Sequence, residues 1–397
     1  MKRRFRLLLL RAMGAAVRRL VPATAAGPAD RPRILVLRPD HLGDVLLSRP
    51  AIDALTAALP AAVVTMAVGP WGRPALGNIE PERLIVCPFP GFSRGGNGPI
   101  QRYRLLLHYA RLLRRGRHDL AVVLRPDHWW GALLVALAGI PMRAGYATPE
   151  TAPFLTLALE PSPGRHAVEE GLALADAVAR ANGYHPTHGI ARGPAQPQPA
   201  VADHVERATI ARLLGEAGTG ARTPLIVLHP GAGSRLKTWP IDRFARVGAR
   251  LAAETGARIA VTGSATERSL AQELCKALPG DTLNLAGSLS WRELEALLAR
   301  ATLVVGVDSG PLHLAVAAHT PSVALFGPAD PAQFAPWGPP ARHRTVYAQL
   351  PCRPCRRLDY CYVEPGTHGP PPCMRAIDEA PVLAAARAVL QPAEAGR

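Results

Sequence analysis

The sequence predicts an α/β protein made of two doubly wound, Rossmann-like domains, each built on a parallel sheet. Three observations lead to this fold class. Short apolar segments of strand length alternate with helical segments in both halves of the chain, as in parallel sheets covered by helices. A chain of 397 residues that is 48% hydrophobic can bury two separate cores. A stretch rich in Pro, Gly and Gln lies between the halves and has the composition of a linker.

The domain boundaries follow from the same alternation. The expected parts are a basic amphipathic extension with its own linker (1–32), a first domain (33–184), an interdomain linker (185–202), a second domain (203–345), and a cysteine-containing segment with a closing helix (346–397).

In the first half, the continuous apolar run Ile34–Arg38 predicts a strand that is buried on both faces. A polar turn and a helical stretch through Leu59 follow, in which Pro50 either kinks the helix or starts a new one. The remaining expected strands are Val63–Val68, Leu84–Cys87 and Leu120–Leu124, and the remaining helices are Tyr103–Arg115, Gly131–Gly139 and Ala167–Ala181.

The second half alternates more regularly. Ser290 and Glu293 form a capping-box pattern at one helix start, and Pro240 and Pro311 suit first helical turns. The expected strands are Leu225–His229, Arg258–Thr262, Leu283–Ala286, Leu303–Val307 and Val323–Phe326, with helices at 240–254, 267–277, 290–300 and 311–318. Because doubly wound sheets bind ligands at the carboxyl ends of their strands, the loops after these strands are the candidate sites.

The net charge of +16 indicates an anionic partner. Only 5% of the residues are aromatic, and no helix-turn-helix, zinc-finger or RNP pattern is present, which argues against nucleic acid. Anionic lipids, phosphorylated glycolipids and nucleoside diphosphates attract a basic surface equally well.

Half of the excess charge lies at the N-terminus. Residues 1–33 contain nine basic residues and a single acid, Asp30. The apolar run Leu7–Leu10 is too short for a secretory signal, and no window reaches the roughly 18 apolar residues of a membrane span. We therefore expect a basic helix on the inner surface of the cytoplasmic membrane, with a disordered basic tail as the alternative.

Two strand-to-helix loops carry the first candidate residues. After the first strand, Gly43 would allow a substrate to approach the carboxylate of Asp44, although an acid at a helix start can also merely balance the helix dipole. After Leu225–His229, the loop has the composition of a phosphate cradle: two glycines, a hydroxyl and two cations. Its candidate residues are Gly231, Gly233, Ser234 and Lys237.

Two further loops of the second half have residues suited to a nucleotide site. Gly263 and Glu267 follow a strand, and Glu267 could accept hydrogen bonds from ribose hydroxyls. The last loop leads into a helix whose first amides favour a diphosphate. Its candidates are Asp308, Ser309, Gly310 and His313. Walker A, G-x-G-x-x-G and G-x-S-x-G patterns are absent, which argues against P-loop ATPases, NAD-dependent dehydrogenases and a hydrolase nucleophile at Ser309.

A short internal repeat suggests that two loops of the first half line one cleft. The sequence Leu-Arg-Pro-Asp-His occurs at 37–41 and again at 124–128, each time at the end of a predicted strand. Arg125, Asp127 and His128 are therefore candidates to bind an anionic sugar acceptor, with chance recurrence as the alternative.

Four cysteines cluster near the end of the chain in a Pro-rich segment. Cys352, Cys355, Cys361 and Cys373 match no standard zinc module, but their density favours a structural metal or a redox pair over disulfides in a cytosolic protein.

Taken together, these loops resemble glycosyltransferase family 9, which includes the ADP-heptose:lipopolysaccharide heptosyltransferases. The resemblance covers roughly residues 33–380. The matching segments are ILVLRPDHLGDVLLSRPAIDAL, LIVLHPGAGSRLKTWP, VTGSATE and VVGVDSGPLHLAVAAHTPSVALFGPADP.

The resemblance implies a GT-B fold, with the two domains facing a central cleft, and an inverting transfer that requires no metal cofactor. It implies that Asp44 is the general base, that Lys237 faces the donor phosphates, and that Glu267 and the 308–313 loop bind the donor. The expected substrates are ADP-heptose and a lipopolysaccharide core acceptor. Transfer of another sugar, a non-catalytic nucleotide-sugar-binding protein and a nucleic-acid-binding protein remain the alternatives.

Overall fold

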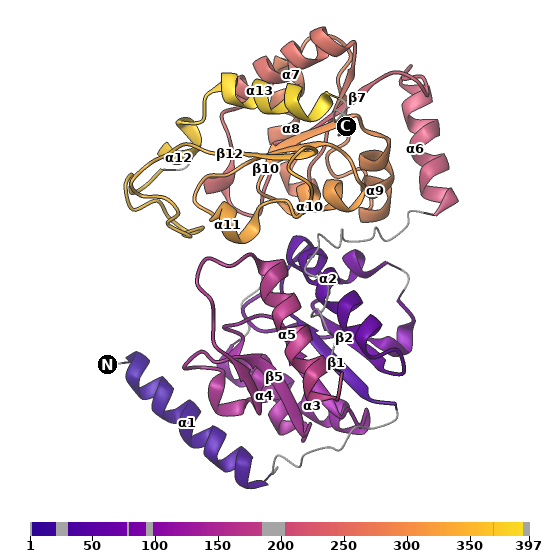
Figure 1. Cartoon of the computed structure of the whole chain (residues 1–397). Helices are drawn as coiled ribbons and strands as arrows, with labels where there is room; N and C mark the ends of the chain where they lie inside the picture. Colours follow the sequence, from indigo (N-terminus) through magenta and orange to yellow (C-terminus); the bar gives the residue numbers. More distant parts are fainter. Residues whose placement is uncertain are drawn as a thin grey trace, which may run out of the picture. The chain divides into compact units, whose positions relative to one another are not determined.

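The computed structural model describes residues 2–20, 31–77, 79–92, 98–184, 203–367 and 369–391. The chain divides into two compact units, Met1–Ala195 and Gln196–Arg397. The predicted linker at 185–202 lies outside the described residues. Each unit is a sheet covered by helices (Figure 1).

The first unit contains a six-stranded parallel sheet in the order β3-β2-β1-β4-β5-β6. The core strands are apolar because helices cover both faces of the sheet. The strands are β1 (Arg33–Arg38), β2 (Val63–Val68), β3 (Leu84–Val86), β4 (Leu120–Val123), β5 (Met142–Tyr146) and β6 (Leu157–Leu159), and the long helices are α1 (Lys2–Leu20), α2 (Leu42–Ala58), α3 (Pro99–Arg115), α4 (Trp129–Leu137) and α5 (Ala167–Ala181).

The second unit repeats this strand order with β12-β11-β10-β7-β8-β9, again parallel throughout. Its strands are β7 (Leu225–His229), β8 (Arg258–Val261), β9 (Leu283–Asn284), β10 (Leu303–Val307), β11 (Ser322–Leu325) and β12 (His343–Val346). Its helices are α6 (His204–Glu216), α7 (Ile241–Thr255), α8 (Arg268–Ala277), α9 (Trp291–Arg300), α10 (Gly310–Ala317), α11 (Pro331–Phe334), α12 (Pro372–Arg375) and α13 (Glu379–Leu390).

The strand order determines where the loops meet. In the first sheet the connections reverse direction between β1 and β4, and in the second sheet between β7 and β10. The loops that leave two such neighbouring strands diverge to opposite faces and open a crevice at the carboxyl edge of the sheet. Every predicted site loop except 263–267 leaves one of these four strands. The predicted fold class, two Rossmann-like domains of the kind that make up GT-B proteins, is thereby confirmed.

The N-terminal segment is helical, and α1 packs on the first unit through Leu10, Gly14 and Val17. A methyl group on Gly14 would come within 2.5 Å of Pro153, so glycine permits this close approach. Within the described part of the chain, no helix combines the length and the apolar character needed to cross a membrane.

Three strands have no counterpart among the predicted elements: β5, β6 and β12. The strand β5 includes the charged residue Arg143. Its guanidinium is fully buried and donates to the carbonyl oxygens of Ile140 and Phe154 at 2.6 and 2.7 Å. Tertiary hydrogen bonds therefore allow a charged residue in an interior strand. Pro50 lies inside α2, which continues through it as one helix.

Candidate active site

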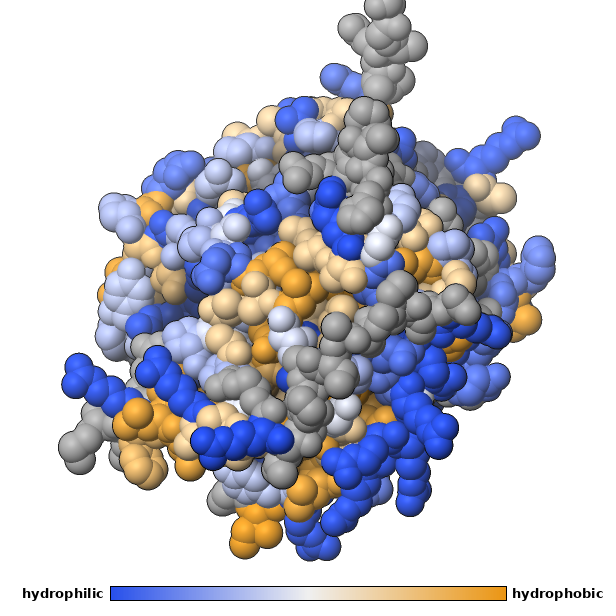
Figure 2. All heavy atoms as spheres, turned by 60° about the horizontal axis from the view of Figure 1, so that its bottom comes forward, coloured by the Kyte–Doolittle hydropathy of each residue, from blue (hydrophilic) through white to orange (hydrophobic). Residues whose placement is uncertain are grey.

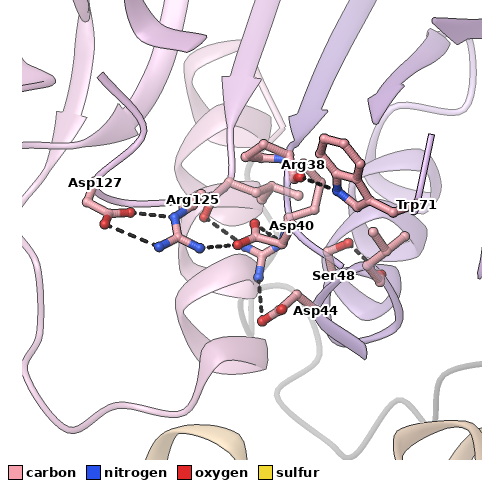
Figure 3. Close-up of polar contacts among 10 residues, drawn as sticks. Arg38, Asp40, Asp44, Ser48, Trp71, Arg125 and Asp127 are labelled. Atoms are coloured by element: carbon pink, nitrogen blue, oxygen red, sulfur yellow. Dashed lines mark hydrogen bonds and ion pairs between the residues drawn. The ribbon is translucent and has the colours of Figure 1, made fainter. Parts of the chain in front are cut away.

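The first candidate loop presents Asp44 at the carboxyl edge of the first sheet. The loop leaves β1, and Asp44 is the third residue of α2, directly after Gly43. Its side chain is 34% exposed, and its Oδ1 lies 3.4 Å from Nη2 of Arg38, the last residue of β1 (Figure 3). The carboxylate is therefore both accessible and oriented by a cation that is itself largely buried.

Asp40, four residues earlier, has the opposite environment. It is 2% exposed, its Oδ2 lies 3.1 Å from Nε of Arg38, and its Oδ1 accepts a short hydrogen bond from Arg125. Burial alone would raise the pKa of Asp40, but the two guanidinium groups outweigh it and hold the pKa below its usual value. Asp40 is thus a structural counterion, whereas Asp44 is available to a ligand.

The internal repeat has a direct structural explanation. The two copies end at neighbouring strands, since Leu37 of β1 pairs with Val123 of β4. Arg125 of the second copy consequently contacts Asp40 of the first and also donates to Asp127 at 2.6 Å (Figure 3). Asp127 is 65% exposed and lies at the surface of this network.

His128 lies behind the loop rather than on its exposed side. The side chain is 5% exposed and is surrounded by Phe89, Phe92 and Trp130, with ring centroids 5.3 to 6.3 Å away. Burial lowers the pKa of His128 to about 4, so the ring is neutral near pH 7. His128 supports the loop between β4 and α4, and Arg125 and Asp127 provide its polar surface.

In the second unit, the loops after β7 and β10 are joined by an ion pair. Lys237 Nζ lies 2.6 Å from Oδ2 of Asp308, with 18% and 7% of the two side chains exposed. Lys237 ends the short helix η4 (Arg235–Lys237), and Asp308 follows β10 directly. The pair places one ammonium group at the switch point of the second sheet.

The loop after β8 contacts the same region through Glu267. Its Oε2 accepts hydrogen bonds from the backbone N and the hydroxyl of Ser264 at 2.7 and 2.8 Å, which closes a capping box. A methyl group on Gly231 would lie 2.3 Å from the Glu267 carboxyl, so the glycine allows this packing. At Gly263 the approach is less tight, since an added methyl group would lie 3.2 Å from Cβ of Glu267.

The remaining donor-loop candidates have varied surroundings. Ser309 precedes α10 and donates its hydroxyl to the carbonyl of Val307 at 2.9 Å, so its side chain does not cap the helix. Gly310 is the first residue of α10, and His313, one turn later, is 7% exposed. The hydroxyl of Ser234 donates to Leu358, far along the chain, at 2.7 Å. Open space surrounds Gly233.

All four clustered cysteines line one small cavity, together with Leu236, Arg353 and several Pro and Tyr residues. Burial, followed by the neighbouring thiols, raises the pKa of Cys373 to about 11. All are free thiols. In the arrangement that the structure shows, the described residues contain no group of three His, Cys, Asp or Glu side chains, these cysteines included, that is close enough together to hold a metal ion.

Sequence reasoning did not assign roles to Arg38, Trp71 or His229. In the sequence, Arg38 is the last residue of a predicted strand and part of the repeated segment 37–41. Trp71 donates from Nε1 to the carbonyl of Pro39 at 2.8 Å and so fixes the turn before Asp44. His229 is buried and pairs with the hydroxyl of Thr262 at 3.0 Å. The repeat at 37–41 and 124–128 was the one available signal for the Arg38 network.

Comparison with known proteins agrees with the resemblance noted above. The model of glycosyltransferase family 9 (heptosyltransferase) matches residues 106–362. Lipopolysaccharide heptosyltransferase 2 of Salmonella typhimurium is 30% identical over 328 residues, covering 80% of this chain and 88% of the relative.

Among solved structures, the E. coli ADP-heptose lps heptosyltransferase II superposes with a TM-score of 0.67 at 25% identity, covering 90% of this chain and 98% of that chain. A glycosyl transferase family 9 structure from Veillonella parvula gives a TM-score of 0.70 at 21% identity, covering 92% and 99%, and supports the fold alone.

Proposed function

Because this chain belongs to glycosyltransferase family 9, we propose that it transfers a heptose from a nucleoside-diphosphate donor, ADP-heptose, to an acceptor in the lipopolysaccharide core. That it is a glycosyltransferase follows from the family. The sugar, the nucleotide and the acceptor are supported by the names of relatives that it covers over most of their length.

The observation that carries the proposal is the environment of Asp44. A partly exposed carboxylate, held by Arg38 at the switch point of a doubly wound sheet, is suited to take a proton from a hydroxyl bound there. Arg125 and Asp127 add a polar surface to the loop of the neighbouring strand, where a phosphorylated sugar acceptor would find a cation and hydrogen-bond acceptors.

The donor is assigned to the second unit. Lys237 and the amides at the start of α10 lie at the carboxyl edge of its sheet and would neutralise the diphosphate. Glu267, held between Gly231 and Ser264, would accept the ribose hydroxyls.

The chemistry is an inverting displacement. The acceptor oxygen forms a bond to the anomeric carbon while the bond from that carbon to the diphosphate oxygen breaks. The acceptor proton passes to Asp44, and the bonding electron pair leaves with the diphosphate. Lys237 and the α10 amides stabilise the negative charge that develops there without reorganising. In this mechanism protein cations meet the charge of the leaving group, and no metal cofactor is required.

We further propose that Cys352, Cys355, Cys361 and Cys373 hold a structural metal. Support comes from their common lining of one cavity in a segment otherwise poor in secondary structure. Binding would require the thiols to move closer together and to lose their protons.

We propose that the protein acts at the inner face of the cytoplasmic membrane, with which it would associate peripherally. The basic helix α1 supports this, as does the amphiphilic nature of a glycolipid acceptor.

A panel of nucleotide sugars tests the function. ADP-heptose should raise the melting temperature and be consumed only when a core acceptor is present. Preference for another nucleotide sugar would support transfer of another sugar to a surface glycan. Binding without turnover would mean a non-catalytic protein, and salt-steep binding of DNA would mean a nucleic-acid-binding one.

A further inference from the structure

Two helices of the first unit expose large apolar side chains although both are strongly basic. Helix α1 contains seven Lys or Arg residues and α3 contains five, and neither contains an acid. Large apolar side chains such as Leu, Ile and Phe are more often buried than exposed to water. Half of the large, clearly exposed hydrophobic side chains in the described part of the chain lie on these two helices.

On α1 the exposed and the buried apolar side chains form separate stripes. Leu10, Gly14 and Val17 face the domain, spaced four and three residues apart. Phe5 and Leu8 lie on the other side and are 71% and 63% exposed, and Leu9 beside them is 48% exposed. The inner stripe, Leu10, Gly14 and Val17, explains why α1 packs on the domain. The outer stripe, Phe5, Leu8 and Leu9, has no partner among the described residues.

The same division occurs on α3. Leu106, Ala110 and Leu113 pack into the core. Ile100, Tyr103 and Leu107, spaced three and four residues apart, form an outer stripe with 77%, 51% and 50% of their surface exposed. Exposed arginines border it: Arg104, Arg111, Arg114 and Arg115.

The two helices that carry the outer stripes both contact α4. Arg6 of α1 stacks on the ring of Trp129 at 5.2 Å, and the indole nitrogen of Trp130 donates to the carbonyl of Arg102 on α3 at 3.4 Å. Apolar residues of all three helices belong to one core cluster. Figure 2 shows that, on the face of the molecule drawn there, hydrophobic side chains are interspersed with protruding hydrophilic ones.

We propose that the outer stripes of α1 and α3, with the arginines around them, form a single docking surface for an anionic lipid bilayer. We call it the α1–α3 face: Phe5, Leu8 and Leu9 of α1 with Ile100, Tyr103 and Leu107 of α3. The proposed membrane association thereby involves the folded domain as well as the N-terminal helix. This inference rests on the proposed function at the inner face of the cytoplasmic membrane.

Charge and hydrophobicity together favour a bilayer over other occupants. The two helices carry basic residues and no acid, which complements anionic headgroups, and each cation near the bilayer surface adds roughly 1 kcal/mol of attraction. The apolar stripes would enter the boundary between headgroups and acyl chains while the arginines remain in the headgroup layer. Binding of nucleic acid would explain the basic residues but not the exposed Leu, Ile and Phe side chains. A second copy of the chain would bring the two sets of cations together.

The position of the face also suits the reaction. The N-terminal end of α3 lies at the carboxyl edge of the sheet, because Arg102 contacts Trp130, two residues beyond the β4 loop residue His128. That loop carries Arg125 and Asp127. A bilayer on the α1–α3 face would therefore deliver the sugar of a lipid-anchored acceptor to this loop.

Substitutions on the outer stripes test the face better than deletion of the N-terminus. Removing α1 would uncover the core residues that Leu10 and Val17 cover, so lost binding could reflect damage to the domain. The informative variants of the full chain are Phe5→Ser/Leu8→Ser/Leu9→Ser, Ile100→Ser/Tyr103→Ser/Leu107→Ser and the charge variant Arg104→Gln/Arg111→Gln. The matched control is Val205→Ser/Val363→Ser, which removes exposed apolar side chains from the second unit.

The measurement is co-sedimentation with phosphatidylcholine vesicles that contain or lack phosphatidylglycerol. We expect binding only to the anionic vesicles and at least about a tenfold loss of affinity in each of the three face variants, since each loses apolar insertion or charge. The control should bind like the wild type. Melting temperature checks folding, and the charge variant, which touches no core residue, decides the case if a serine variant unfolds.

Wild-type vesicle affinity in either α3 variant would overturn the proposal, because α1 alone would then suffice. Loss in the charge variant with full binding by both serine variants would also overturn it and would favour a purely electrostatic partner such as nucleic acid. Turnover of an acyl-free core saccharide should be unchanged in all face variants. Absence of turnover in the wild type would instead refute the proposed function and leave the vesicle result intact.

Discussion

Nη2 of Arg38 lies 3.4 Å from Oδ1 of Asp44, while Nε of the same guanidinium lies 3.1 Å from the buried carboxylate of Asp40. One arginine thus connects a structural ion pair to an accessible carboxylate. The largely buried Arg38, whose side chain is only 10% exposed, therefore orients the carboxylate of Asp44. Two carboxylates four residues apart should consequently respond very differently to the same substitution.

Asp44→Asn should abolish most activity without loss of stability. The amide keeps the size of the side chain but cannot accept the acceptor proton, and general-base catalysis is typically worth about 10²–10⁴ in rate. Turnover, donor affinity and melting temperature measured on the one variant separate catalysis from a helix-start role. More than about a tenth of wild-type activity would place the base elsewhere, with His41 and Asp127 as the next residues to test.

Asp40→Asn should destabilise the first unit. The substitution leaves two guanidinium groups without their buried counterion, and breaking such a pair costs about 3–5 kcal/mol when both partners are buried. The lower end applies here, since Arg125 is 36% exposed. Urea unfolding measures the loss. Asp127→Asn, on a 65% exposed partner of the same arginine, is the control and should cost less than about 1 kcal/mol. Equal effects of the two would contradict this assignment.

Lys237→Ala should weaken nucleotide-sugar binding and slow transfer together. The ammonium group would meet the diphosphate before and during bond cleavage, and a charged hydrogen bond of this kind is worth roughly tenfold to hundredfold. The variant also leaves Asp308 without its cation at 2.6 Å, which adds repulsion toward an anionic ligand. Isothermal titration with the donor and initial rates measure both effects. Lys276→Ala, an exposed lysine of the same unit, should change neither, and unaltered donor affinity in Lys237→Ala would remove this loop from the site.

Stability should fall as the pH drops from about 6.5 to about 4. Burial lowers the pKa of His118, His128 and His343 to about 4, below the ordinary value of 6.5. The unfolded chain therefore binds protons in this window while the folded chain does not, and each such histidine costs up to roughly 1.4 kcal/mol per pH unit. Urea unfolding across the window measures the slope. His128→Leu should reduce the slope for the first unit, and an unchanged slope would mean that His128 is not buried in solution.

Protein purified anaerobically without chelator should contain one metal equivalent if the four cysteines hold an ion. Elemental analysis and thiol titration before and after chelation decide this, and Cys355→Ser should lower the metal content and the stability of the C-terminal segment. The isolated Cys275 provides the control, since Cys275→Ser should leave the metal content unchanged. Four titratable thiols without metal would refute the metal proposal and leave the transferase assignment unaffected.

The sequence by itself determined the fold class and the loops in which to look. Strands such as Leu225–His229 and Leu303–Val307 are continuous apolar runs because both of their faces are buried, and that pattern is local and readable. Glycine, hydroxyl and charged residues directly after those strands marked the candidate loops, including both Asp44 and Lys237. Strands that carry polar residues, such as β5 with Arg143, gave no such signal, since distant carbonyl oxygens stabilise them.

Only the tertiary structure decided which side chains meet. The order of strands in each sheet places β1 beside β4 and β7 beside β10, although many residues separate them in the chain. Those neighbours bring Arg125 to Asp40 and Lys237 to Asp308. They also distinguish a buried Asp40 from a partly exposed Asp44 that looks equally suitable in the sequence. Burial and ion pairing depend on contacts between distant segments, and these arise only when the sheet assembles.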